Sequence, residues 1–121
     1  MKVLGVLNKE LNRLNIHNEF YEWTSKIPKK PYWVYEYIIS DSNPENNQIS
    51  GVILLNGFSR NGLLDLENDK DVIIKHFRNY TTITNGIGLS INSNDGQFMN
   101  TNDNELKRFE IKLNFNEWSV N

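Results

Sequence analysis

The chain contains no cysteine among its 121 residues. This absence excludes disulfides, zinc–thiolate sites and thiol nucleophiles together. Long apolar runs are absent too. The opening MKVLGVL is cut off by Asn8, Lys9 and Glu10, which leaves it too short for the core of a signal peptide, and no later stretch approaches the length of a membrane span. We therefore expect a soluble, intracellular protein with no membrane partner.

An excess of one charge is also lacking. Thirteen Lys and Arg residues face fifteen Asp and Glu residues, for a formal net charge of −2. Duplex DNA and anionic membranes attract strongly basic surfaces, so this balance argues against specific nucleic-acid binding. A mass of 14.2 kDa fits one compact core. We expect a single domain over residues 1–121.

Recognisable catalytic and metal-binding motifs are missing. The chain has only two histidines, His17 and His76, and it carries no G-x-S-x-G motif, P-loop or dinucleotide fingerprint. The alternating acidic residues from Asp65 onward look like the start of an EF-hand loop. That loop needs glycine at its sixth position and glutamate at its twelfth, where Lys70 and His76 stand. The sequence predicts no enzyme, no cofactor and no metal site.

Two segments carry helical signals. The first has apolar residues at spacings of three and four, the stripe of an amphipathic helix over residues 2–14: Val3, Leu4, Leu7, Leu11 and Leu14. The second begins at Asn68, which suits a helix N-cap, and continues with Asp69 and Asp71, which suit the positive end of a helix dipole. It predicts a helix over residues 69–79.

The remaining apolar segments indicate strands. We expect strands over residues 18–27, 31–39, 49–59, 87–91 and 107–118, with an additional short strand near Gln97–Met99. Residues 40–48 form a purely polar loop. The last strand alternates most clearly, and its buried face is predicted to consist of Phe109, Ile111, Leu113 and Phe115. The expected fold is an α+β two-layer sandwich, with a mainly antiparallel sheet of four to five strands and two helices on one face.

The stretch KIPKKPYWVYEYII, residues 26–39, joins a basic turn to an aromatic strand. Basic plus aromatic residues are typical of surfaces that stack single-stranded nucleic acid. Glu19, Glu22 and Glu36 lie in the same region and oppose that interpretation. An aromatic strand that contributes to the core and exposes its rim for protein contact fits the composition better.

The arrangement around this stretch resembles the tail terminator and tail completion proteins, the head–tail joining or collar proteins, of long-tailed bacteriophages. An N-terminal amphipathic helix and a short strand precede the proline-led PYWVYEYI, and a polar loop, a returning strand and a mid-chain helix follow it. The alternating RFEIKLNFNEW closes the pattern. Related collar proteins occur in phage-tail-like bacteriocins. The resemblance covers roughly residues 2–118, with a shorter mid-chain helix and an Asn-rich segment, 92–104, as departures.

The resemblance implies a structural protein that forms a homo-oligomeric ring, commonly of six subunits, at the head-proximal end of the tail tube. Its partners would be the tail tube and sheath or connector proteins, in the host cytoplasm during assembly and then in the virion or phage-tail-like particle. A small immunity protein or another protein-binding module is the alternative of a different class. The residues that we expect at a protein interface are Lys29, Lys30, Tyr37, Asn43, Glu45, Gln48 and Trp118.

Overall fold

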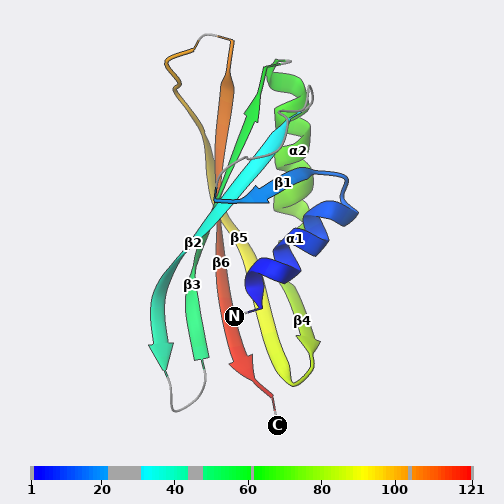
Figure 1. Ribbon diagram of the computed structural model, residues 1–121, viewed down its shortest axis with the longest axis vertical. Helices are drawn as coiled ribbons and strands as arrows, with labels where there is room; N and C mark the ends of the chain where they lie inside the picture. The colour runs from blue at the N-terminus through cyan, green and yellow to red at the C-terminus, as the bar shows by residue number, and fades with distance from the viewer. Residues whose placement is uncertain (1, 22–30, 44–47, 61, 104, 121) are drawn as a thin grey trace.

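A computed structural model describes residues 2–21, 31–43, 48–60, 62–103 and 105–120, with the backbone alone for residues 41–43, 94 and 95. Figure 1 shows the helices packed beside one long, twisted sheet. In chain order the elements are α1 (Val3–Arg13), β1 (His17–Phe20), β2 (Tyr32–Asn43), β3 (Gln48–Ser59), α2 (Leu63–His76), β4 (Tyr80–Thr84), β5 (Ile87–Met99) and β6 (Lys107–Ser119).

The six strands lie in the order β1-β2-β3-β6-β5-β4. β1 runs parallel to β2, and every other neighbouring pair is antiparallel. The predicted sandwich with four to five mainly antiparallel strands is therefore wrong. The sheet is mixed and curls strongly into a half-barrel. Strands of 12 and 13 residues accumulate much twist, and β2 and β5 each carry a register shift that adds to it.

β4 is the strand that the sequence pattern failed to indicate. It is only five residues long and contains three threonines, so it shows little apolar alternation. The predicted strands at 87–91 and near Gln97–Met99 are parts of one strand, β5. β5 pairs with β6 over their whole shared length, from Ile87 opposite Ser119 to Met99 opposite Arg108. Long-range pairing therefore joins segments that look separate along the chain.

Several predicted boundaries also need correction. The second helix begins at Leu63, six residues before the predicted start, directly after Gly62, whose φ of 97° suits glycine. Asn68 thus lies inside α2 and is not an N-cap. The polar loop 40–48 is shorter than expected because β2 reaches Asn43 and β3 begins at Gln48. The predicted strand 18–27 begins one residue earlier as β1, and its residues 22–27 lie outside the described part of the chain.

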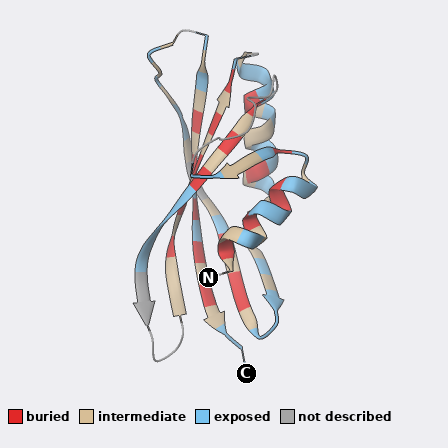
Figure 2. Cartoon of the chain, viewed as in Figure 1, coloured by how far each residue is buried: buried red, intermediate tan, exposed pale blue. Residues whose placement is uncertain are grey.

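The predicted face of the last strand is confirmed, since Phe109, Ile111, Leu113 and Phe115 are all buried. They share the concave face of the sheet with alternate residues of its neighbours, and both helices pack on this face (Figure 2). The rest of the core comprises Val3, Leu7, Leu11, Ile16, Trp33, Tyr35, Ile53, Leu55, Leu66, Ile73, Phe77, Leu89 and Ile91.

The first helix agrees with its predicted stripe and ends where a left-handed residue stops it. Asn15 has φ 59°; its N–H donates to the carbonyl of Asn12, and the N–H of Ile16 donates to that of Leu11. This pair of bonds is the Schellman motif. The start of α1 has no side-chain cap of its own. Instead, the backbone N–H of Lys2 donates to the buried carboxylate of Glu117 on β6.

Candidate protein-interaction site

Two thirds of β2, residues 36–43, form an edge of the sheet that is open among the described strands. β1 pairs with β2 only from Tyr32 to Tyr35, and a last hydrogen bond runs from the Tyr21 N–H to the Tyr35 carbonyl at 2.7 Å. Beyond it, no described strand pairs with residues 36–43 on that side. Backbone groups alternate in the side that they face along a strand. Tyr37 and Ile39 therefore direct their N–H and C=O groups outward, as Tyr35 does.

Apolar side chains are exposed along this open edge. The ring of Phe20 stacks on that of Tyr37 at 6.1 Å and 20°, and it lies 5.8 Å from the ring of Tyr35. The exposed members of the group are Phe20, Tyr21, Tyr37, Ile38 and Ile39. We call these five residues the β2 patch. Tyr37 and Ile39 lie on one face of β2 and Ile38 lies on the other. Exposed apolar residues beside an open edge are typical of a protein-contact surface.

The opposite side of the sheet ends in a second open edge, β4. This strand pairs with β5 alone among the described strands, and its Ile83 is 62% exposed. Asn85 and Gly86 both have positive φ, 53° and 76°, and form the tight turn into β5. Such turns match the twist of a hairpin. The Nζ of Lys2 donates to the carbonyl of Thr84 at 3.1 Å and places a positive charge at the end of this edge.

A polar cleft of about 280 Å³ opens between α2 and the start of β1. Its lining includes His17, Asp65 and Asp69, and Asp69 already accepts a hydrogen bond of 3.2 Å from Nε1 of Trp33. Carboxylates two positions apart on a helix point in nearly opposite directions, so Glu67 and Asp71 do not join Asp65 and Asp69 at this cleft. Among the described residues, no group of three or more His, Asp or Glu side chains is arranged to hold a metal ion.

A buried ionic cluster joins the two helices. The carboxylate of Glu10, only 3% exposed, lies 3.0 Å from Nε2 of His76 and 3.1 Å from Nη1 of Arg13. Burial acts to raise the pKa of Glu10. The hydrogen bonds from His76 and then Arg13 outweigh burial, and the pKa lies below its ordinary value. The cluster links α1 to α2 through the contact between Glu10 and His76.

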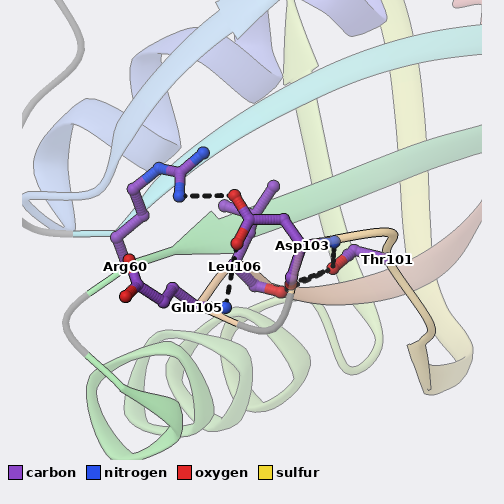
Figure 3. A network of polar contacts seen from close by, with 5 residues as sticks. All are labelled: Arg60, Thr101, Asp103, Glu105 and Leu106. Atoms are coloured by element: carbon purple, nitrogen blue, oxygen red, sulfur yellow. Dashed lines mark hydrogen bonds and ion pairs between the residues drawn. The ribbon is translucent and has the colours of Figure 1, made fainter.

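A second polar network orders the turn between β5 and β6 (Figure 3). The Arg60 guanidinium lies 2.7 Å from the Asp103 carboxylate, which also accepts the Glu105 N–H at 2.9 Å. These two contacts, in that order, lower the pKa of Asp103. The Thr101 hydroxyl lies 2.6 Å and 2.8 Å from the carbonyl oxygens of Asp103 and Leu106. The network ties this turn to the end of β3.

The structure places only some of the residues that we expected at an interface. Tyr37 belongs to the β2 patch, and Asn43 and Gln48 face each other where β2 meets β3. Gln48 donates to Oδ1 of Asn116 at 3.1 Å, and Trp118 packs over Gly88 on β5, two strands away from β3. These residues form no single surface. The remaining three, Lys29, Lys30 and Glu45, lie outside the described residues.

Sequence reasoning missed five exposed apolar residues of the two open edges: Phe20, Tyr21, Ile38, Ile39 and Ile83. The signal in β2 was present, because Ile38 and Ile39 are consecutive apolar residues that fall on opposite faces of the strand. A strand that is apolar on both faces is either covered on both or open to a partner. Only the pairing of β1 with the first third of β2 decides between these cases.

Within the described segments, neither helix has the length and apolar character that a membrane span requires. A scan against protein-family models and a search of curated proteins each found no match to this chain.

Proposed function

We propose that this chain is a structural subunit of a phage tail or phage-tail-like particle, and that it forms a ring capping the tail tube at its head-proximal end. The observation that carries the proposal is the order of elements around the proline-led strand. α1, β1, β2, β3 and α2 follow one another as in the resemblance drawn from the sequence, and the long alternating β6 closes the chain.

The geometry supports a role in assembly better than a role in chemistry. The described part of the chain exposes the apolar β2 patch beside an unpaired strand edge, whereas its buried ionic groups are engaged with one another. A ring of identical subunits requires two different contact surfaces on each subunit. The edges of β2 and β4, on opposite sides of one sheet, are two such surfaces.

The test is to locate the protein on a particle. Tail or tail-like particles from the source cell are labelled with antibody against this chain and imaged by electron microscopy. We expect label at one end of the tube only. A matched experiment adds the purified chain to polymerising tube protein encoded beside its gene, where we expect shorter tubes with closed ends.

Two results would contradict the proposal. Particles that carry no label, or tubes that grow to the same length with and without the chain, would rule out a terminator. Purification of the chain in a one-to-one complex with a toxin encoded next to it would instead establish the immunity-protein alternative.

A further inference from the structure

We propose that the open edge of β2 in one copy pairs with β4 of the next copy, in parallel orientation, so that the sheet continues from subunit to subunit. The inference rests on the proposed function, because it names the contact that would build the ring. It concerns residues 36–43 on one side of the sheet and residues 80–84 on the other.

The two edges lie at the same end of the sheet. Strand registers place five residues in one row across it: Ile39, Gly51, Phe115, Ile91 and Tyr80. In Figure 1 this end is the lower one, where β2 and β4 flank β3, β6 and β5. β1 covers β2 only at the opposite end, over Tyr32–Tyr35. A neighbouring copy beside this end of the sheet therefore meets an open β2 edge with its own open β4 edge.

Strand direction decides the orientation of the pairing. Four successive antiparallel pairs separate β2 from β4, so these two strands run in the same direction within one subunit. Rotation about an axis roughly along the strands preserves that direction in the next copy. β4 and the neighbouring β2 are then parallel. A two-fold contact between two β2 edges would have to be antiparallel, which distinguishes the two arrangements.

The dimensions and the exposed apolar residues of the two edges agree. β4 is five residues long, so the open segment of β2, residues 36–43, accommodates all of it. The register shift after Ile39 limits the regular part of the segment to its first residues. Ile38 and Ile83 are 56% and 62% exposed, and both lie on the convex face of the sheet. At equal height Ile83 would lie beyond Ser42, so the pairing requires the next copy to be displaced along the strands until Ile83 is beside Ile38. This contact removes both side chains from water, which is the main driving force for association.

Charge favours unlike edges over like edges. The open segment of β2, residues 36–43, carries Glu36 and Asp41 and no Lys or Arg. β4 carries no charged residue, and the hydrogen bond from Nζ of Lys2 to the Thr84 carbonyl places a positive charge at its end. Two β2 edges would bring acidic residues together. Pairing β2 with β4 joins opposite charges instead.

Such a contact is heterologous, since each copy uses two different surfaces. Repeated rotation by the same angle either closes a ring or propagates a filament. The strong curl of the sheet means that successive copies turn relative to one another. The contact is therefore of the kind from which a closed ring is built.

The experiment uses two variants that each block one edge. Ile38→Lys places a charge on the β2 edge, and Ile83→Lys places one on the β4 edge; both side chains are more than half exposed, so the fold should tolerate them. The wild-type chain is expected to form a ring in sedimentation velocity. Each variant alone is expected to be monomeric, and an equal mixture is expected to stop at a one-to-one heterodimer. Leu64→Lys, 70% exposed on α2 and on neither edge, is the control that should assemble normally.

Each outcome of this experiment either supports or overturns the proposed contact. A dimer formed by Ile83→Lys alone would show pairing between two β2 edges and overturn the proposal. Unchanged assembly of both edge variants, or a wild-type chain that is monomeric at its highest soluble concentration, would do the same. If particles carry label at one end while the edge variants assemble normally, the proposed function stands and this contact is wrong. If the mixture forms heterodimers but no particle carries label, this contact stands and the proposed function is wrong.

The absence of cysteine allows an independent check in the full chain. The double variant Ile38→Cys with Ile83→Cys should yield a ladder of disulfide-linked oligomers on a non-reducing gel. Because the inter-copy register can differ by two residues, Thr81→Cys replaces Ile83→Cys in a second double variant. Each single cysteine variant should remain unlinked. Efficient dimer formation by Ile38→Cys alone would again point to pairing between two β2 edges.

Discussion

Substitution of Gly57 by alanine is expected to destabilise the protein through one contact. Gly57 on β3 lies directly opposite Trp33 on β2. An added Cβ would lie 2.5–2.6 Å from three atoms of the indole ring. The ring has no room to retreat, because Trp33 is fully buried and its Nε1 donates to Asp69 on α2. Overpacking of a filled core costs about 1–3 kcal/mol, and we expect Gly57→Ala to fall in this range.

Gly5→Ala is the matched control with the opposite sign. Gly5 is an exposed residue inside α1, and a Cβ there meets no atom within 4 Å. Replacing glycine by alanine within a helix reduces the entropy cost of folding, and stabilises it by about 0.5–1 kcal/mol. The same chemical change is thus expected to raise stability at one site and lower it at the other.

The assay is urea unfolding followed by circular dichroism, with midpoints compared at a common m value. For an m value of about 2 kcal/mol/M, Gly57→Ala should lower the midpoint by about 0.5–1.5 M. Adding Trp33→Leu to Gly57→Ala should cost less than the two single changes summed, because the smaller side chain makes room for the methyl group. A Gly57→Ala variant as stable as the wild type, or simple additivity of the two changes, would refute this account of the contact.

Three further outcomes are expected. Leu113→Ala, at a fully buried position of β6, should cost about 2–5 kcal/mol in the same assay, and a smaller loss would mean that the core there collapses around the gap. The pKa of Glu10 is lower in the folded state than its ordinary 4.5, so the stability that its ionised carboxylate contributes is complete above pH 4.5 and is lost as pH falls through the folded pKa. Glu10→Gln should therefore reduce the fall of the urea midpoint at acidic pH. An unchanged fall of the midpoint would count against the cluster. Arg60→Ala should leave the midpoint nearly unchanged but accelerate amide hydrogen exchange at Glu105, since the Asp103 carboxylate that accepts this N–H loses its partner; equal exchange rates would contradict that link.

Local sequence signals predicted the elements whose apolar residues repeat at one period. The stripe of α1 and the alternation of β6 were predicted correctly, because each face of these elements has one environment along its length. The Asn85–Gly86 turn was found for the same kind of reason, since few residue pairs suit two successive positive φ angles. These are properties of a few neighbouring residues.

Other features depend on partners far away in the chain. Glu10 is of a residue type that is seldom buried, yet it is buried where His76 approaches from α2. The start of α1 shows no capping residue, and its acceptor, Glu117, comes from β6. No local pattern indicates a partner more than sixty positions away. Sequence reasoning consequently missed both groups.

The sequence by itself determined that the chain is rich in strands, that β2 is apolar on both faces, and that no cysteine chemistry is available. Tertiary structure alone decided that six strands form one curled sheet and that β1 covers only the first third of β2. Strand order and register are set by contacts between distant segments and by accumulated twist, which no single segment encodes. The exposed edges of β2 and β4, on which the proposed assembly depends, are a consequence of that register.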